Sequence, residues 1–308
     1  MATNDWYLGQ KHFLQSPEWR EFQHKLGNDT IEVNGALGIV ERGKVSKLYF
    51  PYGPCVEQQS GFFEAVVEEA KTLGVDYVRV EPRSGVDAEK LTALGFVKAH
   101  KNIQPEVTAV SDLSVGFDEI FKGLPSNTRN AWRQTEKKGV TFSESRDVQD
   151  VQIFLEMLHS VAARTGMHPH PDEYFQYMAQ TFFPSGAGGL FFAKVEGQVA
   201  AAVLYFQDDT TMYYAHAASF DEFRKLSVAT TILVYALQEA CARGLQFFDW
   251  FGVAPEAFKT PKEEQFYASW QGFTNFKLRF GGSRVTTLGT WDLPLNKLKY
   301  RLFRLLVR

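Results

Sequence analysis

The sequence predicts a mixed α+β protein in which one arrangement of strands and helices occurs twice. In each half, apolar patterning indicates a hairpin, followed by a helix that a glycine ends and by another strand, and the second half adds one strand between hairpin and helix. The length of 308 residues suffices for two domains of about 150 residues each. We therefore expect two similar domains in one chain.

The elements of the two copies follow from their apolar periodicity. In the first copy we predict strands over 31–40 and 44–50 with a turn at 41–44, a helix over 60–73 that ends at Gly74, and a strand over 75–80. In the second copy we predict a hairpin of 190–195 and 198–207 around Glu196 and Gly197, a strand at 211–217, a helix over 226–243 that ends at Gly244, and a strand over 246–251.

Composition narrows the class of protein. Apolar residues make up 44% and charged residues 22% of the chain, as in soluble globular proteins, and no apolar run approaches the ~20 residues that span a bilayer. The N-terminus lacks a basic start and an apolar stretch, so we expect no secretory signal. Cys55 and Cys241 lack metal-ligand spacing, which favours a reducing cytoplasm and no structural metal. With a net charge of −3, any contact with nucleic acid requires a local basic patch.

The most informative stretch runs from Trp270 to Gly282. It sets Lys277 and Arg279 among aromatic residues, which lower the local dielectric, so that a cation there interacts strongly with an anion or oxyanion. Gly281 and Gly282 permit a positive φ or a close approach of the backbone to another group. By pattern alone, the stretch is a strand whose long cations extend out of a core.

This stretch resembles the Phe-Lys-x-x-Phe-Gly-Gly signature of the Fem-type aminoacyltransferases. Other motifs of that family follow in its order along nearly the whole chain. They are Gln15-Ser16-Pro17-Glu18-Trp19, Tyr49-Phe50-Pro51-Tyr52-Gly53-Pro54, Gly95-Phe96, Ile103-Gln104-Pro105, Arg129-Asn130 with Arg133, Lys137-Lys138-Gly139-Val140, Tyr214-Ala215-His216 and Asp249-Trp250-Phe251-Gly252-Val253. The chain is therefore identified as a member of this family.

The resemblance implies two tandem domains with the GNAT acyltransferase fold. The first domain would cover residues 1–113 and be completed by 290–308, and the second would cover 114–289. No long helical hairpin is apparent, so we expect the coiled-coil arm of some family members to be absent. We expect the protein to be a monomer.

The resemblance also implies an activity. Fem-type enzymes move an amino acid from aminoacyl-tRNA to the side-chain amine in the stem peptide of a peptidoglycan precursor, which builds interpeptide bridges, and they use no cofactor. The precursor would be lipid-linked or nucleotide-linked, and the protein would be cytoplasmic, with peripheral contact at the inner membrane surface. Two alternatives stay open: N-acyl transfer from another donor or to another amine, and a non-catalytic module that binds precursor or RNA.

Two residues are candidates for catalysis. Lys277 is expected to stabilise the oxyanion or the leaving tRNA 3′ end, with Phe276 shaping the pocket, although it could instead pair with a structural carboxylate. Glu81 follows the last strand of the first copy, where it could bind the acceptor amine and take its proton. An exposed glutamate without a role explains Glu81 equally well. Asp249 is expected to be buried with a structural hydrogen bond.

Candidates for acceptor binding are mostly aromatic. Tyr174, Tyr214 and His216 offer groups suited to sugar and peptide recognition, although buried aromatic residues with one polar end would look the same. At two positions where the resemblance implies a lysine and an arginine, this chain has Gln23 and His170. Because these hold phosphate or carboxylate less firmly, we expect the acceptor to differ from that of the best-known members.

Two basic segments are candidates for the larger partners. Arg129, Arg133 and Lys137 recur every four residues on a helix predicted from Thr128 to Gly139, and would bind the tRNA unless they are only a solvated face. At the C-terminus, four cations and four leucines lie on separate faces of a predicted helix: Lys297, Arg301, Arg304 and Arg308, and Leu295, Leu298, Leu302 and Leu306. This layout suits a membrane-surface helix, contacts with tRNA phosphates, or a helix docked on the core.

The start of the predicted helix in the second copy indicates whether coenzyme A could be the acyl donor. A GNAT acetyltransferase has glycines there, so that backbone N–H groups can surround the pyrophosphate of coenzyme A. The chain has Arg224-Lys225-Leu226-Ser227-Val228-Ala229, with serine in place of the first glycine. Because the Cβ of Ser227 crowds this approach, coenzyme A is disfavoured as the donor.

Overall fold

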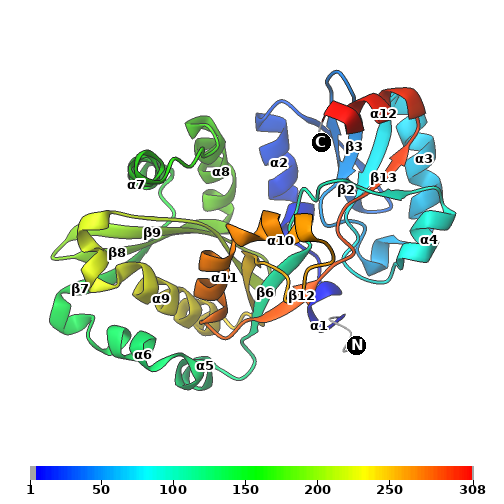
Figure 1. Cartoon of the computed structure of the whole chain (residues 1–308). Helices are drawn as coiled ribbons and strands as arrows, with labels where there is room; N and C mark the ends of the chain where they lie inside the picture. The colour runs from blue at the N-terminus through cyan, green and yellow to red at the C-terminus, as the bar shows by residue number, and fades with distance from the viewer. Residues whose placement is uncertain (1–4, 307–308) are drawn as a thin grey trace. The chain divides into compact units, whose positions relative to one another are not determined.

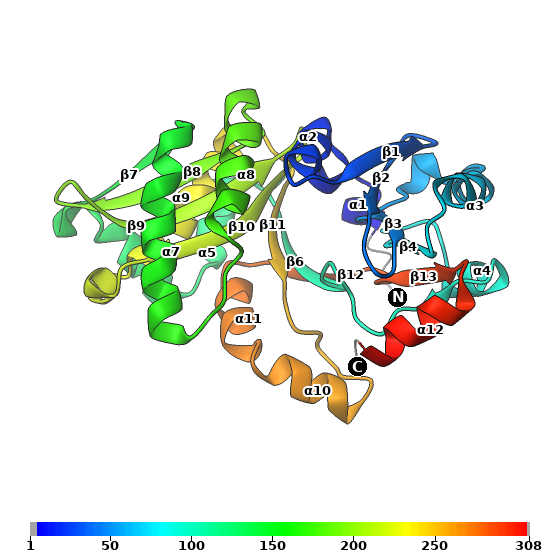
Figure 2. The same ribbon diagram turned by 90° about the horizontal axis from the view of Figure 1, so that it is seen from above.

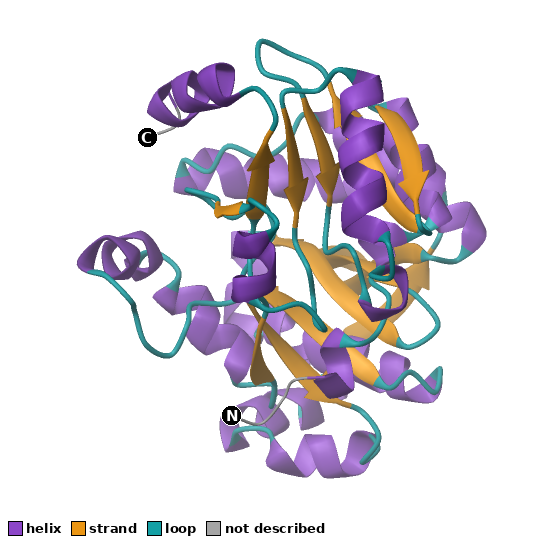
Figure 3. Ribbon diagram, turned by 90° about the vertical axis from the view of Figure 1, so that its right-hand side faces the viewer, coloured by secondary structure: helices purple, strands orange, loops and turns teal. Residues whose placement is uncertain are grey.

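The computed structural model describes residues 5–306, which form two units of mixed helices and strands (Figures 1 and 3). The first unit contains 1–107 and 285–308, and the second contains 108–284. Each unit has one sheet, of six strands in the first and seven in the second. The expected domain limits, after residues 113 and 289, lie a few residues beyond these divisions.

The sheet of the first unit has the strand order β1-β2-β3-β4-β13-β5. Its strands are β1 (Asp29–Val33), β2 (Ala36–Glu41), β3 (Lys47–Phe50), β4 (Tyr77–Val80), β5 (Val97–Lys98) and β13 (Trp291–Pro294). Its α-helices are α1 (Asp5–Leu8), α2 (Pro17–Lys25), α3 (Phe62–Leu73), α4 (Ala88–Ala93) and α12 (Lys297–Leu306). Strands β3 and β4 run parallel because α3 connects them, and α3 buries Phe62, Val66 and Ala70, which share one helix face.

Strand β13 comes from the C-terminal end of the chain and lies between β4 and β5. Arg79 of β4 and Asp292 of β13 stand opposite each other and form a buried, bidentate ion pair with N–O distances of 2.6 and 2.8 Å. The hydroxyl of Tyr300 donates a third hydrogen bond of 2.7 Å to the same carboxylate. The C-terminal segment is thereby fixed to the first unit.

The first hairpin differs from its prediction. The chain turns at Asn34 and Gly35, with φ of 48° and 79°, so one expected strand over 31–40 is two strands, β1 and β2. Asn-Gly is the dipeptide that adopts a positive φ at both positions at little cost and forms tight two-residue hairpins. The turn predicted at 41–44 is confirmed, because β2 and β3 pair antiparallel and the chain turns between Glu41 and Lys47.

The sheet of the second unit has the strand order β12-β6-β11-β10-β9-β8-β7. Its strands are β6 (Val107–Asp112), β7 (Val140–Ser145), β8 (Gly188–Val195), β9 (Gln198–Gln207), β10 (Thr211–Ser219), β11 (Phe247–Gly252) and β12 (Ser283–Thr286). Its α-helices are α5 (Phe117–Gly123), α6 (Ser126–Arg133), α7 (Val151–Thr165), α8 (Asp172–Ser185), α9 (Val228–Ala242), α10 (Pro261–Ala268) and α11 (Gln271–Leu278). Helices α7 and α8 cover one face, and α9, with α5 and α6 beside it, covers the other (Figures 1 and 2).

The two sheets share a plan. In each, an antiparallel pair leads through a long helix to a strand parallel to the second of the pair: β2, β3, α3 and β4 in the first, and β9, β10, α9 and β11 in the second. An antiparallel strand from elsewhere in the chain follows, β13 or β6. The predicted tandem GNAT-like fold is confirmed. Among residues 5–306 the longest helices, α7 and α9, have 15 residues, which leaves no helix of coiled-coil-arm length.

Two helical segments differ from their predictions. The helix expected from Thr128 to Gly139 ends at Arg133, and Lys137 lies on a separate 3-10 turn, Glu136–Lys138. The stretch around Lys277 is the helix α11, not a strand. Its glycines behave as predicted: Gly281 has a φ of 87°, and a Cβ on Gly282 would meet Trp250 and Ala109 at 3.1–3.2 Å.

No helix within the described residues 5–306 is long and apolar enough to cross a bilayer.

Candidate active site

Several predicted residues gather where β10 and β11 stop pairing. The two parallel strands are paired only between Thr211–Tyr213 and Phe247–Asp249. Beyond these residues β10 continues along β9, with a register shift between Tyr214 and His216, and β11 continues along β6. The second unit therefore has a separation between two central strands, which Tyr214 and His216 border.

A tight turn in β11 orients the backbone beside this separation. Phe251 has a φ of 59°, a left-handed conformation that is strained for a residue with a side chain. The buried carboxylate of Asp249 stabilises the turn by accepting hydrogen bonds from the Phe251 N–H, at 2.7 Å, and from the Thr108 hydroxyl. Asp249 thus has the structural role predicted for it.

Helix α11 holds the chain that follows this turn. The ammonium of Lys277 donates to the carbonyl of Gly252 at 2.9 Å. The buried hydroxyl of Thr274, one turn earlier on the helix, accepts from the N–H of Ala254 at 2.9 Å. The Lys277 Nζ lies 5.3 Å from the ring centroid of Phe273 and 5.7 Å from that of Tyr214. The lysine is therefore fixed between a backbone carbonyl and two aromatic rings.

Burial changes the electrostatics of Lys277. It lowers the pKa of this ammonium to about 8, although the Asp249 carboxylate raises it in part. Near neutral pH the group stays mostly protonated and is poorly solvated. A cation in such surroundings stabilises a nearby negative charge more strongly than one in water does.

Three of the predicted acceptor-binding residues, His216, Tyr214 and Tyr174, are neutral near pH 7. Burial, aided by His170 and Lys277, lowers the pKa of His216 to about 4. Burial raises the pKa values of Tyr214 and Tyr174 to about 12, so both hydroxyls remain protonated. The site therefore combines the Lys277 cation with these three neutral hydrogen-bonding groups.

An aromatic cluster connects the predicted acceptor residues. The ring of His216 meets buried Phe175 at 5.1 Å, and His170 stacks on Tyr174 at 4.1 Å with 18° between the rings. Tyr174 and Phe175 are themselves in edge contact at 5.6 Å. The structure thus brings His170, Tyr174 and His216 together through Phe175, which the sequence analysis did not select.

The aromatic residue beside Lys277 is not the predicted one. Phe276 packs against Phe280 at 5.4 Å, whereas Phe273 lies against the ammonium. Residues four apart share a helix face, so helical periodicity would have identified Phe273. The family signature places Phe276 beside Lys277 in sequence, but consecutive side chains of a helix point in directions about 100° apart.

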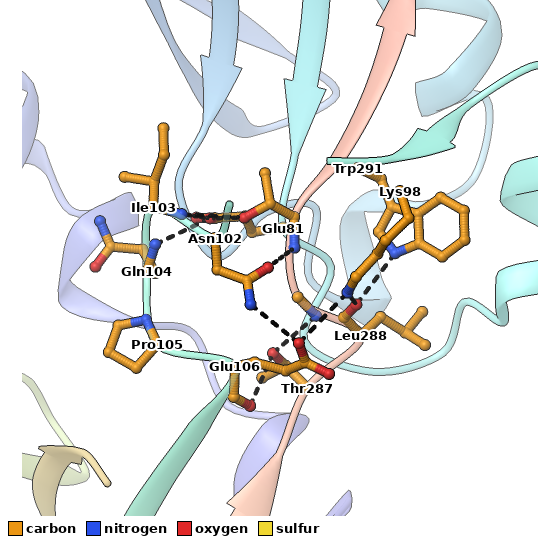
Figure 4. A network of polar contacts seen from close by, with 12 residues as sticks. Glu81, Lys98, Asn102, Ile103, Gln104, Pro105, Glu106, Thr287, Leu288 and Trp291 are labelled. Carbon is orange, nitrogen blue, oxygen red and sulfur yellow. Dashed lines mark hydrogen bonds and ion pairs between the residues drawn. The ribbon is translucent and has the colours of Figure 1, made fainter. Parts of the chain in front are cut away.

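Glu81 lies in the first unit and is buried, not exposed as one alternative expected (Figure 4). One carboxylate oxygen accepts from the N–H groups of Ile103 and Gln104, at 3.2 and 3.0 Å. Hydroxyls of Thr290 and Tyr49 donate to the same carboxylate at 2.5 and 2.6 Å. Burial raises the pKa of Glu81, while these donors lower it in part.

The network around Glu81 extends along the segment from Asn102 to Glu106. Asn102 accepts from the Thr290 N–H at 2.9 Å and donates to the carboxylate of Glu106 at 3.0 Å. The carbonyl of Glu106 accepts from the Thr287 N–H at 2.8 Å, and Lys98 donates to the Leu288 carbonyl (Figure 4). Glu81 therefore links the segment from Asn102 to Glu106 to the end of β4. Its predicted proton-transfer role has no support in this geometry.

Gln23 is also placed differently from its predicted substrate-binding role. It is 6% exposed, and its amide oxygen accepts from Asn28 at 2.9 Å. The side chain thus stabilises the turn between α2 and β1. Proximity in sequence to a family motif does not reveal such local burial.

The three predicted tRNA-binding cations differ in their surroundings. Arg129 donates to the carbonyls of Lys122 and Leu124 and so caps the end of α5. The guanidinium of Arg133 lies 5.7 Å from the ring centroid of Phe121. Lys137 is exposed. They do not form one helical stripe, because α6 ends at Arg133.

The turn before α9 is the place where a GNAT acetyltransferase would bind the pyrophosphate of coenzyme A. Ser227 has a φ of 62°, the left-handed conformation that glycine adopts without strain. The backbone shape of a phosphate-binding turn is thus present, but the Cβ of Ser227 remains where a pyrophosphate would approach. The residues present do not fit this cofactor well.

Comparisons with known proteins agree with the fold. A family model described as an acetyltransferase (GNAT) domain matches residues 125–260. A curated protein from Weissella viridescens, described as a UDP-N-acetylmuramoylpentapeptide-lysine N(6)-alanyltransferase, is 27% identical over 225 residues. That match covers 66% of this chain and 66% of that protein's length.

Solved structures match over nearly the whole chain. The crystal structure of FemX has a TM-score of 0.81 at 18% identity and covers 97% of both chains. The C-terminal domain of a putative lysylphosphatidylglycerol synthetase from Agrobacterium fabrum has a TM-score of 0.61 at 13% identity, covering 93% of this chain and 91% of that one. At these identities the structural matches concern the fold alone.

Proposed function

We propose that this Fem-type protein, an acyltransferase of two GNAT-like units, moves an aminoacyl group to the side-chain amine in the stem peptide of a peptidoglycan precursor. The observation that carries the proposal is the poorly solvated Lys277 ammonium beside the separated strands β10 and β11. The description of the Weissella viridescens relative as an alanyltransferase acting on a pentapeptide lysine supports the substrate class. The products would be bridges between stem peptides.

The proposed donor is aminoacyl-tRNA. The amine nitrogen would attack the ester carbonyl and form a C–N bond, and the C–O bond to the terminal ribose would break. The proton lost by the amine would end on the released hydroxyl. Since the ester is already activated, the protein need only align the reactants and stabilise the oxyanion. Lys277 is the residue suited to the second task, and the proposed reaction uses no coenzyme A.

The acceptor would contact the aromatic cluster. Neutral His216 and protonated Tyr214 and Tyr174 provide hydrogen-bond donors and acceptors without a competing charge. His170 stands on this cluster where the family resemblance implies an arginine. We therefore expect weaker binding of a precursor phosphate or carboxylate at this point than an arginine would give.

The tRNA would contact the basic segment around α6. Arg129 is engaged in capping α5, so Lys137 offers the clearest test. Lys137→Ala should weaken tRNA binding and reduce the slope of log affinity against log salt by about 0.7–0.9. Lys71→Ala, at an exposed lysine paired with Glu68 in the first unit, serves as the control and should leave the slope unchanged. A slope unchanged by Lys137→Ala would remove this lysine from the tRNA surface.

Transfer of radiolabelled amino acid tests the function. The donors would be a total pool of charged tRNA and, separately, labelled acetyl coenzyme A. The acceptors would be the nucleotide-linked pentapeptide and its lipid-linked form, each with lysine or diaminopimelate at the third position. We expect label from tRNA on one acceptor. Label from acetyl coenzyme A alone would establish another acyl transfer, and binding of precursor without any transfer would establish a binding module.

Because aminoacyl-tRNA is made in the cytoplasm, the proposed reaction would take place there. A lipid-linked acceptor would require peripheral contact with the inner membrane surface.

A further inference from the structure

Helix α12 (Lys297–Leu306) presents a row of apolar side chains to solvent. Leu298, Leu302 and Leu305 are 71%, 54% and 59% exposed. Spacings of four and three residues place them on one helix face. The alternative in which the leucine face of this helix docks on the core does not hold for Leu298 and Leu302, while Arg308 and the side chain of Leu306 lie outside the part of the chain that the structure describes. An exposed apolar row of this kind indicates an interaction surface.

The opposite face of α12 is fixed to the first unit. The buried hydroxyl of Tyr300 donates to Asp292 at 2.7 Å, and its ring lies 5.3 Å from that of Tyr77. Phe303 stacks on Tyr77 at 5.6 Å with 29° between the rings. Since Tyr300 holds the helix by a buried hydrogen bond, α12 cannot rotate its leucines inward without breaking it.

The start of α12 is also fixed. The side chain of Asn296 accepts from the Lys299 N–H at 3.1 Å, in the manner of an N-cap. The carbonyl of Asp76 accepts from the N–H groups of Leu295 and Asn296, at 3.0 and 2.8 Å. The contacts at the start of α12 and those of Tyr300 and Phe303 together fix the orientation of the helix, and with it the direction in which the leucines point.

Cations border the leucine row on both sides. At about 100° per residue, the leucines lie opposite Tyr300, with Lys297, Arg301 and Arg304 on one flank and Lys299 on the other. All four cations are exposed, Lys299 also pairs with Asp76 at 3.1 Å, and the helix contains no acidic residue. The surface therefore offers apolar groups between positive charges.

The combination of exposed leucines and flanking cations favours one kind of binding partner over the others. A tRNA backbone would neutralise the cations but leave the leucines in water. A second copy of the helix would bury the leucines but bring like charges together. An anionic phospholipid surface satisfies both, because headgroups meet the cations while acyl chains receive the leucines.

We propose that α12 is an interfacial helix that lies on an anionic phospholipid bilayer, with Leu298, Leu302 and Leu305 inserted among the acyl chains. The consequence for the acceptor rests on the proposed function: a protein bound in this way would meet a lipid-linked precursor at the membrane surface. The binding itself does not depend on that activity.

Cosedimentation of the full chain with large unilamellar vesicles tests the proposal. The vesicles contain phosphatidylcholine alone or with phosphatidylglycerol, and neither donor nor acceptor is present. We expect binding to the anionic vesicles that weakens with salt. The variant Leu298→Ser/Leu302→Ser/Leu305→Ser should bind at least about tenfold more weakly, because three side chains lose their apolar burial.

The matched control is Val56→Ser/Leu94→Ser, which changes two apolar residues of the first unit that are 48% and 39% exposed. It should bind as the unaltered protein does. A second variant, Arg301→Glu/Arg304→Glu, should lose binding to anionic vesicles while the leucines are intact. Circular dichroism and thermal melting verify that each variant is folded.

Several outcomes would overturn the proposal. Absence of binding to either kind of vesicle would do so, as would equal binding by the triple-leucine variant. A dimer that this variant converts to a monomer, without vesicle binding, would assign the surface to a second copy. If, in a separate measurement with uncharged tRNA, this variant lost tRNA binding while its binding to vesicles was unchanged, the surface would be assigned to RNA. Since the assay contains no substrates, none of these results bears on aminoacyl transfer to a nucleotide-linked acceptor.

Discussion

The two units terminate their parallel strand pairs in opposite ways. In the first unit, β3 and β4 stay paired to Phe50 and Val80, and Glu81 then closes this end with its own N–H donating to Gly53. In the second unit, β10 and β11 part after Tyr213 and Asp249. The same arrangement of strands thus gives a closed end in one unit and an open one in the other.

The polar groups at these ends differ in what they can still bind. The Glu81 carboxylate accepts from two hydroxyls and two backbone N–H groups, which leaves it little capacity for a substrate. The Lys277 ammonium has three donors, and within the described residues it donates one hydrogen bond, to Gly252. A charged group whose hydrogen-bonding capacity is filled by the protein therefore has a structural role, whereas one with remaining capacity is a candidate for an active site.

The largest effect on stability is expected at the buried ion pair of the first unit. Asp292→Ala leaves Arg79 buried without its partner and removes the acceptor for Tyr300. We expect a loss of about 3–5 kcal/mol in the free energy of unfolding, measured by urea titration. Glu32→Ala, which removes an exposed pair with Arg20, should cost less than about 1 kcal/mol. Similar losses in both variants would show that the buried pair does not fix β13.

A somewhat smaller loss is expected for Glu81→Ala. The substitution leaves the N–H groups of Ile103 and Gln104 without their acceptor and should destabilise the protein by about 2–4 kcal/mol in urea titration. Turnover of the folded fraction of Glu81→Gln should stay within a few-fold of the unaltered protein. A fully folded Glu81→Gln variant without turnover would instead show that Glu81 is catalytic, and the ends of the parallel strand pairs in both units would then be functional.

Removal of the charge at Lys277 should not destabilise the protein. Because burial lowers the pKa of Lys277 to about 8, the unfolded chain binds more protons than the folded one between about pH 8 and 10.4. The free energy of unfolding of the unaltered protein should therefore increase relative to that of Lys277→Met as the pH rises through this window. Below pH 8 the unaltered protein should be no more stable than the variant. Near pH 7 the variant should be the more stable protein, by up to about 3 kcal/mol, measured by thermal or urea unfolding. A variant less stable than the unaltered protein at pH 7 would indicate that Lys277 is structural.

The smallest effect is expected for Phe273→Ala. It removes one ring from beside the ammonium, and the lost cation–π contact should cost about 0.5–1 kcal/mol. Because burial is the main cause of the lowered pKa of Lys277, access of water in place of the ring should raise this pKa toward its ordinary value. The pKa can be measured by nuclear magnetic resonance of the labelled lysine side chain. Phe266→Ala changes a more exposed ring on α10 and should leave this pKa unchanged. Equal shifts in both variants would remove Phe273 from the site.

Local rules predicted much of this fold from the sequence. Glycines after apolar helices marked the ends of α3 and α9, and Glu196-Gly197 marked the hairpin of β8 and β9, because these positions need a left-handed backbone. The same rule, applied to Asn34-Gly35, would have located the first hairpin. These features depend on a few neighbouring residues and are therefore visible in sequence.

The candidate site was predicted less completely, because its properties depend on distant parts of the chain. Lys277 was selected for its aromatic neighbours, but its bond to Gly252 comes from another element. Glu81 received a proton-transfer role, whereas its donors come from the segment after β5 and from the residue before β13. Whether a polar side chain is saturated depends on tertiary contacts, which periodicity and motifs do not report.

Single-turnover transfer by Lys277→Met shows whether the Lys277 ammonium stabilises the oxyanion of the proposed reaction. The rate of amide formation from charged tRNA would be compared with that of the unaltered protein and of Lys262→Met, which changes an exposed lysine on α10. We predict a loss of about 100- to 1000-fold for Lys277→Met, without a decrease in its melting temperature, and an unchanged rate for the control. A rate for Lys277→Met within a few-fold of the unaltered protein would contradict the assignment of the open strand end of the second unit as the active site.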